Sequence, residues 1–222
     1  MRAVETALFV VALLIGGLVV FALLWSGVGP YEELARANKA MAMDFYDRSG
    51  RLTSWDLTAA LDVHRQWAAY VTGAASESPR FVADIRFTED EYAHMADVRN
   101  VFVTAKFLVP VSLLVIVIRL QRARARSARE MWQLVRDGSL IAAACVVLIG
   151  IVATFAFEPL FLAFHYVFFP QGNFLFDPAT SNLIRLYPDW YWEGISLRVG
   201  LSFIAVALGL AAVAQARLRS AK

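Results

Sequence analysis

Residues 139–157 read SLIAAACVVLIGIVATFAF, a run of 19 residues without a charged side chain. An α-helix needs about 20 apolar residues to cross the hydrocarbon core of a bilayer. Three further windows have the same character, at 7–25, 101–118 and 195–214. The sequence therefore predicts a mainly α-helical, polytopic membrane protein with four transmembrane helices.

The overall composition agrees with a membrane protein. Of the 222 residues, 59% are hydrophobic and 18% are charged, whereas about a quarter of a typical soluble domain is charged. The apolar excess is concentrated in the four windows, which excludes an ordinary soluble enzyme and a disordered chain. A single cysteine allows no internal disulfide, so any part outside the membrane must fold through helix packing and buried aromatic side chains. The net charge of +2 gives no indication of nucleic-acid binding.

The first two spans each contain a feature that could argue against them. Residues 1–25 resemble a signal peptide, but their apolar run exceeds the roughly 7 to 15 residues of such peptides and no A-x-A cleavage pattern follows. We therefore expect an uncleaved anchor helix. The window 101–118 contains Lys106 and Pro110. A lysine near a helix end can reach the interface, and membrane helices tolerate proline.

Arginines between the second and third spans predict the orientation. Residues 119–138 hold six arginines against two acidic residues, which is typical of a short cytoplasmic loop. An alternative is that this basic segment binds lipid headgroups or a partner. Four spans place both termini on one side, and the basic residues at Arg2 and in the tail 215–222 agree that this side is cytoplasmic. We expect a multi-pass protein of the cell membrane.

The segments 26–100 and 158–194 are expected to form an extracytoplasmic cap. Helical composition predicts two cap helices, over 30–47, ending near Gly50, and over 54–71, ending at Gly73. The inward positions of the second helix are predicted to be Leu57, Leu61, Trp67 and Val71. Alternation over 81–87 predicts a short β-strand.

A strong helix start follows this strand. Thr88 can cap a helix that begins at Glu89, with Glu91 completing a capping box. Phe87 and Tyr92 occupy the two positions of a hydrophobic staple, and acidic residues in the first turn suit the helix dipole. Because nothing before Pro110 forces a stop, this helix is predicted to run directly into the second span.

Two of the three histidines are predicted to lie at one membrane interface. His94 precedes Val101 by seven residues, which is about 10 Å along a helix and corresponds to headgroup depth. Pro159 should interrupt the third helix at Glu158, so that the apolar segment containing His165 returns to the interface. Residues 157–192 contain 12 aromatic residues out of 36, which indicates either a substrate-binding surface or an aromatic belt.

Imidazole is the side chain that acts as acid and base near neutral pH, so two converging histidines indicate catalysis. Asp97 lies three residues after His94 and could orient that ring or pair with Arg99. His64 lies within a predicted cap helix and is expected to be structural, so that its replacement should be nearly silent. Cys145 lies in an apolar run that disfavours a thiolate nucleophile.

Two blocks of the sequence resemble a known family. Residues 87–102 contain F-T-x-x-E-x-x-H-M-x-D-V-R, and residues 161–192 contain F-x-x-F-H-x-x-F-F followed by N-L-I-R-L-Y-P-D-W-Y. They resemble the two signature blocks of the bacterial lipoprotein intramolecular transacylases, whose four spans and outer cap also match. Two departures are Phe174, where a tryptophan is expected, and Ser181-Asn182, which replaces an expected acidic residue.

The resemblance implies a reaction and a catalytic pair. The sn-2 acyl chain of a diacylglyceryl lipoprotein moves to the α-amine of its own N-terminal cysteine, which gives a lyso-form lipoprotein. His94 and His165 are implied to be catalytic, one accepting a proton from the amine and the other stabilising the oxyanion or protonating the departing oxygen. Which histidine takes which role stays open. No cofactor or metal is implied.

The expected partners are the diacylglyceryl lipoprotein and the bilayer lipids, with no nucleic acid; the oligomeric state stays open, with a monomer as one option. Substrate-positioning roles are predicted for Glu91, Asp97, Arg99, Phe164, Tyr166, Phe168, Phe169, Asn182, Tyr187, Trp190 and Tyr191.

Two alternatives belong to other functional classes. The first is a metal-assisted membrane hydrolase in which His94, His165 and either Asp97 or Glu91 bind zinc. The second is a non-catalytic membrane receptor or assembly factor whose cap binds a partner.

Overall fold

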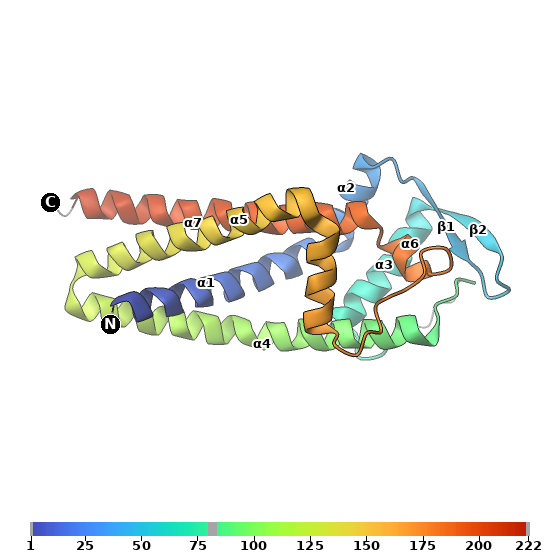
Figure 1. The fold of residues 1–222 in the computed structure, drawn as a ribbon, viewed down its shortest axis with the longest axis horizontal. Coiled ribbons are helices and arrows are strands. Elements are labelled where there is room, and N and C mark those ends of the chain that lie inside the picture. The colour runs from blue at the N-terminus through green and yellow to red at the C-terminus, as the bar shows by residue number, and fades with distance from the viewer. Residues whose placement is uncertain (1, 80–83, 221–222) are drawn as a thin grey trace. The chain divides into compact units, whose positions relative to one another are not determined.

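The computed structural model describes residues 2–79 and 84–220. Along the chain the elements are α1 (Arg2–Trp25), α2 (Val28–Ala37), β1 (Ala42–Tyr46), β2 (Leu52–Asp56), α3 (Leu57–Val71), α4 (Glu89–Arg126), α5 (Ala128–Phe168), α6 (Asn182–Leu186) and α7 (Asp189–Ser220) (Figure 1). Two compact units result. The membrane unit comprises Met1–Ala22, Ala105–Ala156 and Leu197–Lys222, and the cap unit comprises Leu23–Thr104 and Phe157–Ser196.

The long helices confirm the predicted mainly α-helical membrane protein. Among the described residues, α1, α4, α5 and α7 are the four helices long and apolar enough to cross a membrane. Large apolar side chains such as Phe107, Leu148 and Phe155 are exposed on the membrane unit. Such exposure is costly in water but suits helices that are surrounded by lipid.

Small residues let the helices of the membrane unit approach closely. A Cβ added to Gly138 would lie 2.5 Å from a ring carbon of Phe9, and one added to Gly16 would lie 2.9 Å from the Cβ of Ser112. Because lipid tails are as apolar as the side chains, helices in membranes associate mainly through such close packing. Gly16 and Gly138 therefore serve helix contact.

The basic segment at 119–138 is not a loop. It is helical on both sides of Ser127, where α4 ends and α5 begins. Arginine, alanine, leucine, glutamine and glutamate are good helix formers, and the Ser127 hydroxyl accepts a hydrogen bond from the backbone N–H of Glu130 at 3.0 Å. Arg126 also pairs with the carboxylate of Glu5 at 2.6 Å. The helices therefore extend beyond the predicted spans, and one residue makes the turn.

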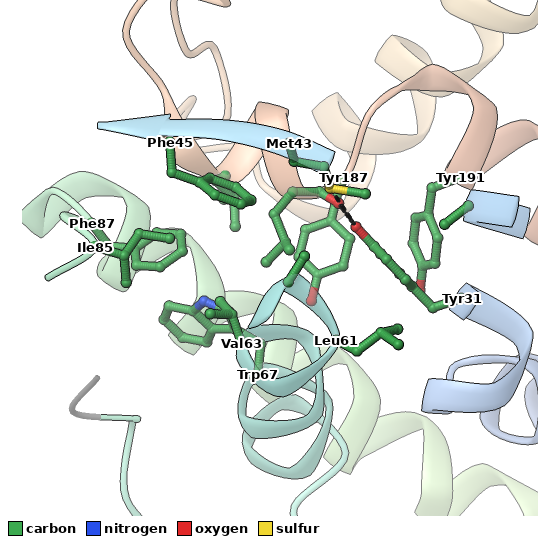
Figure 2. Close-up of a cluster of buried hydrophobic side chains, with 14 of the residues drawn as sticks. Tyr31, Met43, Phe45, Leu61, Val63, Trp67, Ile85, Phe87, Tyr187 and Tyr191 are labelled. Carbon is green, nitrogen blue, oxygen red and sulfur yellow. Dashed lines mark hydrogen bonds between the residues drawn. The ribbon is translucent and has the colours of Figure 1, made fainter. Parts of the chain in front are cut away.

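The cap unit contains a β-hairpin where a helix was predicted. The helix expected over 30–47 ends at Ala37, and β1 pairs antiparallel with β2 from Ala42 opposite Asp56 to Tyr46 opposite Leu52. Within β1, Met43 and Phe45 alternate with exposed residues and point into the cap core (Figure 2). This burial against the rest of the cap outweighs the helical propensity of the segment.

The second predicted cap helix is confirmed with a later start. It begins at Leu57 rather than at Ser54, and the Asp56 side chain caps it by accepting from the N–H of Ala59 at 2.8 Å. Gly73 follows the helix with a positive φ of 76°, as expected for a glycine stop. The four predicted inward positions, Leu57, Leu61, Trp67 and Val71, are all buried.

The cap core is built around large aromatic side chains. Tyr31, Phe45 and Trp67 are completely buried, and Figure 2 shows them converging from α2, β1 and α3. The Tyr31 hydroxyl donates a hydrogen bond to the carbonyl of Leu186 at 2.5 Å. This bond satisfies the buried phenol and attaches α6 to the core.

The strand predicted over 81–87 lies partly outside the described residues, which do not include Phe81, Val82 and Ala83. In the described part, Ile85 forms an isolated antiparallel bridge with Asp47.

The capping box before α4 is confirmed. The Thr88 hydroxyl accepts from the N–H of Glu91 at 3.2 Å, and the Glu91 carboxylate accepts from the N–H of Thr88 at 2.7 Å. The rings of Phe87 and Tyr92 contact each other as the staple requires. The helix then continues through Pro110 to Arg126, as predicted.

The third long helix is interrupted three residues before Pro159. Ala156, not Glu158, has non-helical backbone angles, with φ −147° and ψ 50°. A proline ring clashes with the carbonyl four residues earlier, here that of Phe155, and the adjacent Ala156 absorbs the distortion. The chain then returns to helix and carries His165 on the last turns of α5. The final long helix, α7, begins at Asp189, ahead of the predicted window.

Candidate active site

The cap unit brings two histidines from different helices together. His94 lies on the second turn of α4 and His165 on the last turns of α5. Their ring centroids are 6.0 Å apart and their planes differ by 23°. The two residues are only 6% and 8% exposed. The structure therefore brings together the two histidines that the sequence analysis expected to converge, and their place at the membrane interface stays a prediction.

Phenylalanine rings surround this histidine pair. Phe169 lies 4.8 Å from His94 and 5.4 Å from His165 between ring centroids. Phe161 and Phe174 contact His165 at 4.2 and 5.1 Å, and Phe176 contacts His94 at 5.6 Å. The imidazoles therefore lie in apolar surroundings, where polar interactions with a substrate gain strength.

The hydrogen bonds of the pair indicate how the rings are protonated. Nδ1 of His165 lies 2.8 Å from the carbonyl oxygen of Phe161. A carbonyl only accepts, so Nδ1 carries the proton and Nε2 of the neutral ring holds the lone pair. Nδ1 of His94 is buried and has no hydrogen-bond partner among the described residues. A buried ring nitrogen without a partner is available to a substrate group.

Burial also sets the charge of the two rings. It lowers the pKa of His94, and the charge that a protonated His165 would carry lowers that pKa further, against the smaller raising effects of the Asn173 side chain and of the Asp97 charge. Burial likewise lowers the pKa of His165, against the opposing effect of its bond to Phe161. Both imidazoles are therefore neutral at neutral pH, the form that can accept a proton from an amine.

Asp97 makes neither of its two expected contacts. Its carboxylate accepts hydrogen bonds from the side-chain amides of Gln171 at 2.7 Å and Asn173 at 2.6 Å. Asp97 thus fixes the loop after α5 against α4, beside the histidine pair. Arg99 instead donates to the backbone carbonyl of Tyr70 in the last turn of α3 and to that of Ala75 beyond it, the latter at 2.6 Å.

Glu91 lies one turn before His94 and is almost completely buried. Besides closing the capping box, its carboxylate accepts from the Ser181 hydroxyl at 2.6 Å and from the backbone N–H of Leu183 at 2.8 Å. The carboxylate therefore holds the start of α6 against the start of α4. Ser181 stands in the dipeptide that replaces an expected acidic residue, and here it donates to an acid.

The predicted aromatic residues at the end of α5 line the pair or flank it. Phe169 is buried between the rings, whereas Phe164, Tyr166 and Phe168 are about half exposed. Phe164 contacts His165 at 5.5 Å and Phe168 at 4.5 Å. These side chains offer an apolar surface next to the imidazoles.

The remaining predicted residues form a second group around His64. The hydroxyl of Tyr187 is 3.2 Å from Nδ1 of His64, and Tyr191 contacts the His64 ring at 6.0 Å. Trp190 contacts Tyr31 at 5.7 Å. Asn182 instead supports the cap hairpin, because its side-chain amide forms hydrogen bonds with the backbone of Tyr46.

Sequence reasoning left several contacting residues out of the candidate site. They are Phe161, Gln171, Asn173, Phe174, Phe176, Ser181 and Trp192. Helical spacing could have indicated Phe161, which lies four residues before His165 and therefore on the same face. Trp192 lies in the first turn of α7, and the others lie in the segment between α5 and α6, whose path has no periodic signal.

The carboxylates near the pair are engaged by amides and hydroxyls. In the described part of the chain, no group of three or more His, Cys, Asp or Glu side chains has the spacing to hold a metal ion. The zinc site considered from the sequence would need Glu91 or Asp97 beside both histidines, and the donors already bound to these carboxylates do not favour it.

Four apolar helices and a cap that buries two neighbouring neutral imidazoles define the class of this protein as a polytopic membrane enzyme. Residues 42–192 match the family described as lipoprotein intramolecular transacylase Lit. The chain therefore belongs to the Lit family. No curated protein sequence gives a significant match.

Solved structures show the same fold. The membrane integral lipoprotein intramolecular transacylase Lit from Bacillus cereus is 13% identical, with a TM-score of 0.71 over 99% of this chain and 97% of that chain. Two variants of the Bacillus cereus protein, with a histidine replaced by arginine or by alanine, are 13% and 14% identical and give TM-scores of 0.67 and 0.68. Both alignments cover 99% of this chain, with 93% and 94% of the relatives.

Proposed function

We propose that this enzyme transfers the sn-2 acyl chain of a diacylglyceryl lipoprotein to the α-amine of the N-terminal cysteine. The reaction takes place at the extracytoplasmic interface and gives a lyso-form lipoprotein. The observation that carries the proposal is the pair of buried, neutral imidazoles 6.0 Å apart within a ring of phenylalanines.

His165 is the general base. Its Nδ1–H bond to the Phe161 carbonyl fixes the tautomer, so Nε2 can take the proton of the attacking amine. The same hydrogen bond then stabilises the imidazolium that forms. The amine nitrogen bonds to the ester carbonyl carbon, and the ester C–O bond breaks. His165 returns its proton to the departing glyceryl oxygen, so the enzyme is unchanged.

His94 is the electrophilic partner. A neutral imidazole retains one N–H, which can donate a hydrogen bond to the oxyanion of the tetrahedral intermediate. The absence of a partner for its Nδ1 among the described residues supports this role, because the substrate then completes its hydrogen bonding. Because His94 only donates a hydrogen bond while His165 transfers the proton, the charge of His94 does not change.

The protein's main contribution is orientation. The transfer passes through an eight-membered ring of N, Cα, Cβ, S, two glyceryl carbons, the ester oxygen and the carbonyl carbon. Because rings of this size close slowly, holding the ends together can supply up to about 7 to 11 kcal/mol in favourable cases. The half-exposed Phe164, Tyr166 and Phe168 provide an apolar surface for the lipid chains. Conversion of an ester to an amide is downhill and needs no ATP.

The test is mass spectrometry of a synthetic diacylglyceryl lipopeptide after incubation with the purified protein. The expected product has an unchanged mass and carries the acyl group on the amine. Loss of a fatty acid to water would instead identify a lipase. An unchanged substrate would support a receptor or an assembly factor.

A further inference from the structure

The outer edge of β1 pairs with the chain at Ile85 and Arg86 near Tyr46 and Asp47, but it is open at Ala42 and Asp44, where it borders a groove. Antiparallel strands alternate between hydrogen-bonded and non-bonded pairs. Leu57 donates to the carbonyl of Met41 at 2.9 Å and Asp47 to that of Arg51 at 2.8 Å, so the odd residues of β1 bond to β2. The backbone groups of Ala42, Asp44 and Tyr46 therefore point away from β2, along the outer edge of β1.

An amide group already occupies the end of this edge. The Asn182 side chain accepts from the N–H of Tyr46 at 2.8 Å and donates to the carbonyl of Tyr46 at 2.8 Å. This is the pair of bonds that a neighbouring strand would make. At Ala42 and Asp44, no hydrogen bond from the described residues reaches the outer backbone groups. The next positions of the edge are therefore free to pair.

The open positions border a groove of about 250 Å³, whose far side is formed by Arg185, Pro188 and Trp190. The guanidinium of Arg185 is held in place, since Nη2 donates to the Ala179 carbonyl at 3.1 Å. The groove thus offers strand-edge donors and acceptors beside two apolar side chains, those of Pro188 and Trp190, which together fit an extended peptide.

Contacting rings relate the groove to the histidine pair. Successive centroid distances are 4.2 Å from His165 to Phe161, 5.4 Å to Trp192, 5.1 Å to Tyr191 and 6.4 Å to Trp190. Trp190 is therefore at most about 21 Å from His165. An extended chain advances about 3.3 Å per residue, so at most about six residues bridge that distance.

We propose that this groove binds the polypeptide of the lipoprotein substrate within about six residues after the lipidated cysteine. The segment adds to β1 as a third strand, with its backbone on Ala42 and Asp44. The inference rests on the proposed function, because it assumes that the cysteine lies at the histidines. Recognition through the backbone accepts many sequences and explains how one enzyme can hold different lipoproteins.

Substrate length tests this proposal directly. A diacylglyceryl lipopeptide of about ten residues should have a KM about tenfold lower than one of two residues, with a similar kcat. A long peptide with N-methyl groups from residue 3 to about residue 7 should return to the KM of the short one, because it lacks the N–H groups that pair with the edge. These comparisons change only the substrate, so they do not depend on the stability of a protein variant.

A matched pair of variants tests the edge itself. Asp44→Pro removes an outward N–H from β1, and Ser54→Pro removes one from the opposite residue of β2, on the edge away from the groove. Only Asp44→Pro should raise the KM of the long peptide toward that of the short one. Equal KM values for long, short and N-methylated peptides, with transfer intact, would overturn the groove alone. No transfer with any peptide would overturn the proposed function, and the groove with it.

Discussion

Glu91 of α4 accepts a hydrogen bond from the backbone N–H of Leu183 in α6, with 2.8 Å between oxygen and nitrogen. This bond joins the two sequence blocks that carry His94 and His165. The Glu91 carboxylate is buried and also binds Thr88 and Ser181. A carboxylate with only donors around it is the group that these contacts require.

Replacing Glu91 with glutamine is therefore expected to destabilise the cap. The glutamine NH₂ group would face hydrogen-bond donors, and a buried donor without an acceptor costs about 1 to 3 kcal/mol. Turnover should fall because α6 is released from α4 beside the histidines. Thermal unfolding in detergent, together with the lipopeptide assay, measures both effects. Glu89→Gln is the control, since Glu89 lies on the same turn but is exposed. Equal stability of the two variants would contradict a structural role for Glu91.

His64 should make stability depend on pH. Burial lowers its pKa from 6.5 to about 4 in the folded state, so between these values the unfolded state binds more protons. The free energy of unfolding should therefore fall as the pH decreases from about 6.5 to 4, by at most about 1.4 kcal/mol per pH unit from this group. His64→Phe keeps a ring against Tyr31, which stacks on His64 at 4.4 Å, and should reduce this slope.

The expectation that replacing His64 is nearly silent for acyl transfer stands, but stability should change. His64 is completely enclosed and contacts Tyr31 and Tyr187, so His64→Ala should leave a cavity and lower the melting temperature. It should not alter the chemistry, because its ring belongs to the cap core. If the free energy of unfolding depends on pH in the same way in the wild type and in His64→Phe, another group is responsible for that dependence.

The parts of the fold that were predictable depend on local patterns. Four apolar runs identify the spans through their length alone, and the capping box of Thr88 and Glu91 uses residues three apart. The hairpin was missed because the propensity of 42–46 is outweighed by burial of Met43 and Phe45 in a core formed by distant segments. The basic segment was assigned to a loop because its charge describes orientation but not backbone conformation.

In the candidate site, too, only the features that depend on local sequence patterns were predictable. Placing the two histidines at one interface followed from their spacing to the apolar windows. The partners of Asp97 could not be predicted, because Gln171 and Asn173 lie more than 70 positions away and no periodicity relates them to α4. The role of Asn182 as a substitute for a strand residue is likewise visible only once β1 is known.

Topology can be measured with single cysteines on a Cys145→Ala background. Both termini are expected in the cytoplasm, so Ser76→Cys in the cap should react with a membrane-impermeant thiol reagent in intact cells and Ala125→Cys should not. Both positions are exposed in the structure, so burial does not explain a difference. Labelling after membrane permeabilisation shows that Ala125→Cys is reactive. Reaction of Ala125→Cys alone in intact cells would place the histidines on the cytoplasmic side.

The histidine pair makes the most specific prediction. His165→Asn keeps a side-chain N–H near the position of Nδ1, where it can still donate to the Phe161 carbonyl, but it lacks the basic Nε2. It should lower turnover on the order of 10² to 10⁴, the contribution of a positioned base, without lowering the melting temperature. His94→Asn keeps a donor near Nδ1 and should lose less activity than His94→Ala, because an N–H suffices to stabilise the oxyanion. Because both side chains act on one transition state, the double variant should be barely slower than His165→Asn. Full transfer by both single variants in the mass assay would exclude the proposed mechanism and leave the family and the fold unaffected.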